Sequence, residues 1–198
     1  MSADLDHLVG FVAAHPSSGT MTSNGLDLAA FHQRLLRVNW RALDPREYRS
    51  TAECIMRVAR CTGEVPEDCC YALEFCLLPQ GSLSEIAAHA IPFLGELAVH
   101  GLGLPCIYEL FGYILCAVES NEQHPLCRRC RDAIHAELAT CWQHLASPEV
   151  ATRTRVQALL VFLYFPDERP RWQPLLDRIL ASEPGTEIAE VILEELAG

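Results

Sequence analysis

Apolar residues along this chain recur at steps of three and four, the spacing that places them on one face of an α-helix. The clearest example lies between residues 127 and 145, where six apolar side chains follow one another at these steps. They are Cys127, Cys130, Ile134, Leu138, Cys141 and Leu145. Val, Ile and Thr do not cluster in the alternating pattern of β-strands. The pattern predicts an all-α protein.

Helix-start signals divide the chain. Ser82-Leu83-Ser84-Glu85 is a capping box, and Ser50-Thr51-Ala52-Glu53 is another if the preceding helix breaks there. Asp44-Pro45-Arg46-Glu47 and Ser147-Pro148-Glu149 each place a capping residue before a proline. With a further break at Pro92, these signals predict helices over 3–14, 27–38, 45–61, 66–78, 83–90, 92–99, 105–119, 125–146, 149–164, 171–181 and 186–196.

The predicted helix 105–119 is apolar nearly all round, which is typical of a central helix with neighbours on several sides. A chain of 198 residues is long enough for one good core and short for two. We therefore expect one helical domain over 1–198. Residues 16–25 are rich in Ser, Thr, Gly and Asn, so 1–25 could be a loosely attached helix and linker.

Between Trp40 and Leu97, one helix end, a proline-marked junction and a helix start follow one another, with small residues where two helices must approach closely. The matching pattern is Asn39-Trp40, Leu43, Tyr48, Ala52, Ala72-Leu73, Gln80-Gly81-Ser82 and Ala88 to Leu94. It resembles the HEAT-like helical repeat proteins of bacteria, in particular a group of immunity proteins to secreted toxins. Where members of that group carry Tyr-Gly, this chain has Tyr48-Arg49.

This resemblance implies a HEAT/armadillo-like stack of antiparallel helices, a short α-α superhelix. It also implies that the chain binds a toxin and is not an enzyme, because the group carries no catalytic residues. Nucleotide-binding and hydrolase motifs are absent as well. We expect no cofactor.

The formal net charge is −11, and the negative excess sits in two segments. Residues 61–127 hold nine acids and residues 179–198 hold five, and neither segment contains Lys or Arg. The simpler interpretation is that these acids solvate the outer faces of helices. The alternative is that they repel nucleic acid and anionic lipid and attract a basic partner protein.

Under the second interpretation, acids near helix ends and on one helix face are the candidate partner-binding residues. Glu119 and Glu122 are the first candidates, since an acid at a helix C-terminus is mildly unfavourable and calls for another role. First-turn acids such as Glu67 and Asp68 already favour the helix dipole. The full candidate set is Glu64, Glu67, Asp68, Glu74, Glu119, Glu122, Glu187, Glu190 and Glu194.

Ten cysteines raise the possibility of zinc or disulfides. Cys127 and Cys130 have the spacing of a zinc-binding pair, but they belong to the apolar stripe and lack a second such pair, so we expect buried thiols and no metal. The N-terminus is acidic where an export signal needs Lys or Arg, and no apolar run reaches the roughly 18 residues of a membrane span. We therefore expect a cytoplasmic location, where a disulfide framework is unlikely. Cys70 is the candidate reactive thiol.

The sequence thus favours a cytoplasmic immunity protein that covers the active site of a toxin with an acidic surface. A nuclease, either a DNase or an RNase, is the expected target, because nucleases have basic clefts. The alternative is a helical-repeat scaffold or regulatory module that binds cellular proteins and has no toxin partner.

Overall fold

We describe the protein from a computed structural model, which places residues 25–43, 50–61 and 63–197. Within these residues the chain forms helices and no β-strand, which confirms the all-α prediction. The predicted helix 3–14, most of the linker 16–25 and the signal at 44–47 lie outside the described residues. The α-helices are α1 (Leu28–Arg37), α2 (Trp40–Leu43), α3 (Thr51–Arg60), α4 (Glu67–Leu77), α5 (Glu85–Val99), α6 (Cys106–Glu119), α7 (Pro125–Ala136), α8 (Leu138–Ala146), α9 (Thr152–Leu163), α10 (Arg169–Ser182) and α11 (Glu187–Ala197).

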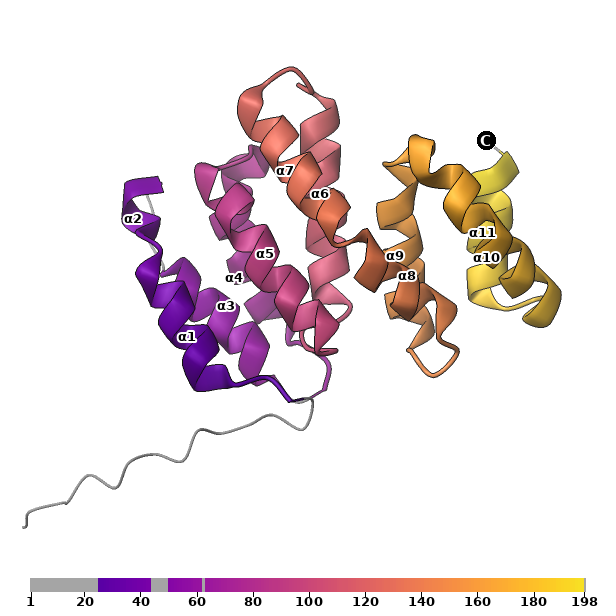
Figure 1. Cartoon of the computed structure of the whole chain (residues 1–198), viewed down its shortest axis with the longest axis horizontal. Helices are drawn as coiled ribbons and strands as arrows, with labels where there is room; N and C mark the ends of the chain where they lie inside the picture. Colours follow the sequence, from indigo (N-terminus) through magenta and orange to yellow (C-terminus); the bar gives the residue numbers. More distant parts are fainter. Residues whose placement is uncertain (1–24, 44–49, 62, 198) are drawn as a thin grey trace, which may run out of the picture.

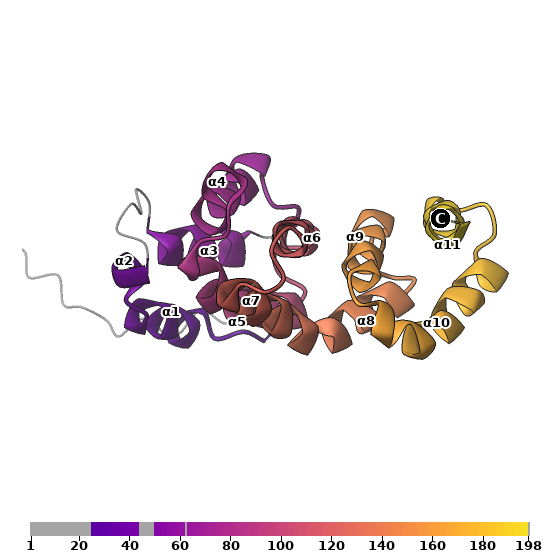
Figure 2. The same ribbon diagram turned by 90° about the horizontal axis from the view of Figure 1, so that it is seen from above.

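The helices are arranged in two layers along an elongated molecule (Figure 1). Seen from above, α1, α5, α7, α8 and α10 follow one side, and α4, α6, α9 and α11 follow the other (Figure 2). Helices α1 and α11 lie at opposite ends of this stack. From α3 to α9 each helix contacts the next one along the chain, and helices of one layer also contact each other, as α5 contacts α7 and α6 contacts α9.

Helix α6 occupies the middle of the stack. It contacts α4, α5, α7 and α9, and its side chains Ile107, Leu110, Phe111 and Ile114 are completely buried. The prediction of a central helix is confirmed. None of the helices in the described segments combines the length and apolarity that crossing a bilayer requires.

The helix-start signals had mixed outcomes. Ser50 caps α3, as its side chain accepts a hydrogen bond from a backbone N–H in the first turn. The capping box that starts at Ser82 is wrong, because α5 begins only at Glu85. Ser84 directly precedes α5, but its hydroxyl donates to the carbonyl of Cys76 and does not cap the helix. The prediction at Ser147 is wrong, because residues 147–150 form turns and α9 begins at Thr152.

Two predicted helix boundaries are wrong. No break occurs at Pro92, which lies inside the continuous helix α5. Its ring faces solvent, and the neighbouring residues Ile91 and Leu94 are completely buried. A proline within a helix costs about 3 kcal/mol, and burying two large aliphatic side chains contributes a similar amount or more. Packing therefore carries the helix through the proline.

The predicted helix 125–146 is instead divided at Glu137 into α7 and α8. The Glu137 carboxyl lies against Gly95 of α5, in space that a Cβ at position 95 would fill. Burial raises the pKa of this carboxyl. The predicted apolar stripe is nevertheless confirmed, because all six of its side chains are buried on both sides of the division.

A partly buried ion pair joins α8, α9 and the end of α10. The guanidinium of Arg155, on α9, donates to both carboxylate oxygens of Glu183 at 2.6 and 2.8 Å and to the carbonyl of Leu145 at 3.1 Å. Arg155 is 3% exposed. The hydrogen bonds from Arg155 lower the pKa of Glu183. These contacts fix the end of α10 against α8 and α9.

We predict that Arg155→Met lowers the free energy of unfolding by about 2 kcal/mol, because the carbonyl of Leu145 and the partly buried carboxylate of Glu183 both lose their hydrogen-bond donor. Urea denaturation measures the loss. Arg171→Met is the matched control, since that side chain is 79% exposed beside Glu168 and should change stability by less than about 1 kcal/mol. Equal losses in the two variants would contradict this account of Arg155.

A second polar contact lies inside the stack. The hydroxyl of Tyr108 lies 2.6 Å from Nδ1 of His144. Burial raises the pKa of Tyr108 and lowers that of His144, so the phenol donates and the neutral imidazole accepts. Protonation of Nδ1 would place two donors opposite each other.

We predict that His144 makes the stability of the protein fall in mild acid. The folded-state pKa of His144 lies below its ordinary value of 6.5, so the unfolded chain binds the proton more readily. The contribution is full above about pH 6.5 and is lost as the pH falls through the folded-state pKa. The free energy of unfolding, measured by urea denaturation at several pH values between 7 and 5, should fall less for His144→Gln than for the wild type. His89→Gln, at an exposed histidine, serves as the control and should keep the wild-type slope.

Candidate functional site

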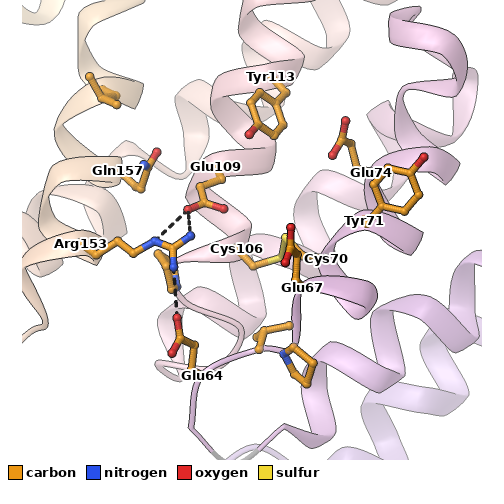
Figure 3. Close-up of a pocket in the computed structure, with 14 residues that line it drawn as sticks. Glu64, Glu67, Cys70, Tyr71, Glu74, Cys106, Glu109, Tyr113, Arg153 and Gln157 are labelled. Atoms are coloured by element: carbon orange, nitrogen blue, oxygen red, sulfur yellow. Dashed lines mark hydrogen bonds and ion pairs between the residues drawn. A yellow bond between two sulfur atoms is a disulfide. The ribbon is translucent and has the colours of Figure 1, made fainter.

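A groove of about 800 Å³ opens between α4, α6 and α9 (Figure 3). Four of its lining residues are acidic and one is basic. It also carries two tyrosines and a disulfide. These residues are Glu64, Glu67, Glu74, Glu109, Arg153, Tyr71, Tyr113, Cys70 and Cys106. We call this feature the acidic groove.

Helical periodicity produces the groove face of α4. Glu67, Tyr71 and Glu74 follow one another at steps of four and three and line the groove. Cys69 and Leu73 fall on the opposite face, and both are buried. A side chain on one face of a helix recurs after three or four residues, so the same sequence supplies a core face and an acidic face.

Helix α6 repeats the arrangement. Cys106, Glu109 and Tyr113 lie at steps of three and four and line the groove. The other faces of α6 are buried in the stack. Each of these two helices therefore presents a cysteine, a tyrosine and acid to the same space.

Arg153 of α9 closes one end of the acidic groove. Its guanidinium lies 2.7 Å from Glu109 and 3.1 Å from Glu64 (Figure 3). The hydrogen bond with Glu109 is the main reason why the pKa of Arg153 is raised. Glu67 acts on Arg153 only over a longer distance. Four carboxylates against one guanidinium leave the lining strongly negative.

The nine acids of residues 61–127 separate into those with and those without an ion-pair partner. Most of them form ion pairs with arginines from elsewhere in the chain: Glu64 and Glu109 with Arg153, Asp68 with Arg57, Glu85 with Arg129, Glu96 with Arg34, and Glu122 with Arg131. Among the described residues no ion pair within 4 Å is found for Glu67, Glu74 or Glu119. Two of these three line the acidic groove.

Two exposed tyrosines line the groove together with Glu67 and Glu74. Tyr71 is 65% exposed and Tyr113 is 52% exposed. Phe75, which directly follows Glu74 on α4, is 45% exposed. Exposed aromatic side chains are unusual away from binding surfaces, where they supply contact area and attract cations to their ring faces. Chemically, the acidic groove is suited to hold arginine or lysine side chains.

The structure gathers part of the predicted site. Glu64, Glu67 and Glu74 line the acidic groove, whereas Asp68 points to Arg57 on α3, 2.9 Å away. Glu119 is exposed at the end of α6, and Glu122 lies 3.6 Å from Arg131.

The glutamates of the last helix form a separate surface. Glu187, Glu190 and Glu194 are exposed on α11, at the far end of the stack from α4 (Figure 2). The candidate set therefore does not form one surface.

Sequence reasoning missed Glu109, which is the innermost acid of the groove, with 18% of its side chain exposed. It is the single acid in a helix that is otherwise apolar over its first turns, and this was the available signal. Arg153 was also missed, since its position depends on the packing of α9 beside α6.

The expectations about cysteine need one correction. Cys70 is bonded to Cys106, so the prediction that it is a reactive free thiol is wrong. Cys70 projects away from the core face that holds Cys69, and this projection directs it to α6. Cys127 and Cys130 are buried thiols. In the described part of the chain, no three His, Cys, Asp or Glu side chains are placed to hold a metal ion.

A second hollow, of about 470 Å³, lies between α8, α9 and α10. Trp142, Phe162 and Trp172 line it, with ring centroids 6.3 Å apart in each successive pair. The indole N–H of Trp172 is buried and meets no acceptor among the described residues. Because this hollow is mainly apolar, we take the acidic groove as the candidate site.

Comparison with known proteins finds no family model that matches this chain, and likewise no curated protein and no solved structure that matches it.

Proposed function

We propose that this protein binds a basic partner protein in the acidic groove. The observation that carries the proposal is the pair Glu67 and Glu74, which lack ion-pair partners among the described residues and line the groove together with two exposed tyrosines. A cationic side chain entering this space would gain charge-assisted hydrogen bonds and contact with an aromatic ring face. Apart from Glu119, the other acids of residues 61–127 already form ion pairs with arginines from elsewhere in the chain.

Preorganisation supports the same proposal. The groove walls are helices packed into a common core, and the Cys70–Cys106 disulfide joins α4 to α6. A partner therefore meets carboxylates that are already in place, and little conformational entropy is lost on binding. Negative potential over the groove would also raise the rate of association with a positive surface.

The partner we propose is a bacterial toxin of the nuclease class, and this chain is its immunity protein in the cytoplasm. Support comes from the resemblance to HEAT-like immunity proteins and from the charge of the groove. A nuclease must hold phosphates, so its active-site cleft carries basic side chains. A rigid stack of HEAT-like repeats presenting carboxylates would bind the basic side chains at that cleft, cover it and exclude the nucleic acid.

Rescue from toxicity tests this function. The product of the neighbouring gene is expressed in bacteria with and without this chain, and survival is scored. Survival only in the presence of the chain supports an immunity role. Growth arrest despite good expression, with binding to other cellular proteins, would replace it with the scaffold function.

We predict that Glu67→Gln with Glu74→Gln slows association with the toxin roughly tenfold at low salt and leaves a smaller effect at high salt. The matched control is Glu187→Gln with Glu190→Gln, which removes the same charge from α11. Stopped-flow association rates are compared for both pairs. Equal slowing would show that overall charge matters and the acidic groove does not.

The tyrosines provide an independent prediction. Tyr71→Ala should speed dissociation by about tenfold or more, because aromatic side chains at the centre of an interface contribute about 1–2 kcal/mol or more each. Tyr164→Ala is not a suitable control, because that side chain packs against the core. Leu193→Ala is preferred, since Leu193 is 57% exposed on α11. Surface plasmon resonance gives both dissociation rates.

A further inference from the structure

The Cys70–Cys106 disulfide is part of the acidic groove. Both cysteines line it, and the sulfur–sulfur bond joins α4 to α6 (Figure 3). Cys70 is half-buried and Cys106 is 3% exposed. A small reagent in the groove therefore reaches the sulfur of Cys70 more easily than that of Cys106.

The other cysteines of α4 face away from the groove. Cys69 and Cys76 are buried, and the sulfur of Cys76 lies 3.9 Å from that of Cys54 on α3. Cys54 is also buried, at 3% exposed. The disulfide on the groove side of α4 is therefore separated by the helix from the buried cysteines on its core side.

The two sides of α4 are held in different ways. Its core side buries Cys69, Leu73, Cys76 and Leu77, and the helix contacts α3 and α5 there. Its groove side faces a space of about 800 Å³, and the disulfide links this side to α6. Opening the disulfide would leave α4 attached to its core neighbours but no longer tied covalently to α6.

We propose that the Cys70–Cys106 disulfide is a reversible redox site that adjusts the acidic groove, with the closed disulfide as the form that binds the partner more tightly. The reductant is a small dithiol. Its thiolate attacks the sulfur of Cys70, a mixed disulfide forms, and Cys106 leaves as a thiolate that takes up a proton. The second thiol of the reagent then displaces Cys70, and the reagent is released as its cyclic disulfide, having supplied two electrons.

The opened form binds more weakly because its two rows of carboxylates and tyrosines lose their fixed separation. Glu67, Tyr71 and Glu74 belong to α4, whereas Glu109 and Tyr113 belong to α6. A partner would have to fix their separation on binding, and the conformational entropy lost in doing so weakens the complex. This part of the inference rests on the proposed function, whereas the opening of the disulfide does not.

Thiol labelling tests the redox site without any partner. The folded protein is treated with dithiothreitol and then with a maleimide, and labelled peptides are identified by mass spectrometry. Trypsin leaves residues 61–127 in one peptide because they contain no Lys or Arg, so a protease that cuts after Glu is added. Cys116 is exposed and should be labelled with or without the dithiol, which provides an internal reference.

Label on Cys70 only after reduction, with Cys54 and Cys76 unlabelled throughout, is the expected result. Hydrogen exchange in residues 67–74 should then become faster on the order of tenfold, with exchange in α8 unchanged. Absence of label on Cys70 in the folded, reduced protein would overturn the redox site. Equal labelling of Cys54 and Cys76 would show unfolding of α4 as a whole and would overturn it too.

Binding to the toxin tests the effect on the groove. We expect the dissociation constant to rise roughly tenfold on reduction and to return on reoxidation with oxidised glutathione. Cys70→Ser with Cys106→Ser should match the reduced protein, and Cys116→Ser should match the wild type. If the double variant does not fold, the reduced wild type supplies the measurement.

The outcomes separate the two proposals. An unchanged dissociation constant, together with label on Cys70, would overturn the control of binding and leave the acidic groove as the binding site. Loss of binding to the toxin in every redox state, with the same labelling pattern, would overturn the proposed function and leave only the redox site.

Discussion

The burial of α6 on nearly all sides fixes the geometry around it. Its contacts with α4, α5, α7 and α9 bring together elements from both layers of the stack. Completely buried side chains such as Leu110 and Phe111 tolerate little change in volume, so their packing keeps the neighbours of α6 close together. Where α6 is left uncovered, Glu109 and Tyr113 face the acidic groove. The site is therefore the one strip of the central helix that packing leaves open.

Acidic and basic side chains that are separated along the sequence form ion pairs in the folded protein. The segment 61–127 lacks arginine, and Arg129, Arg131 and Arg153 from the following segment form ion pairs with its acids. Exposed pairs of this kind contribute little to stability, typically about 0–1 kcal/mol. Their effect on the surface is larger, because they cancel the field of most acids in the segment. The carboxylates that remain uncompensated are concentrated at the groove.

Much of the fold follows from local sequence, while its boundaries do not. Periodicity alone predicts α4, α6 and the buried stripe of α7 and α8, because a side chain's face depends only on its place along the helix. The continuity of α5 through Pro92 depends on burial by other elements, and the break at Glu137 coincides with a contact to Gly95. Such contacts join residues distant in sequence, and no local signal contains them.

The site shows the same limit. Glu67 and Glu74 could be selected from the sequence as acids on one face of a helix. That they share a groove with Glu109 and Arg153 could not be predicted, since this requires α4, α6 and α9 to be adjacent. The pairing of Cys70 with Cys106 likewise spans 36 residues and depends on the same adjacency. Helix faces are predictable here, whereas neighbouring helices are known only from the packed structure.

Adjacency also couples the charge of the groove to its disulfide. Carboxylates near a cystine repel an attacking thiolate, and they disfavour the thiolates that reoxidation needs, so both directions of exchange are slowed. A cationic partner would cancel this field. If the closed disulfide binds that partner more tightly, thermodynamic reciprocity requires the partner to stabilise the closed disulfide by the same factor. At equilibrium the disulfide would then be harder to reduce in the complex than in the unbound protein. The redox state of the Cys70–Cys106 disulfide would therefore depend on whether the groove is occupied.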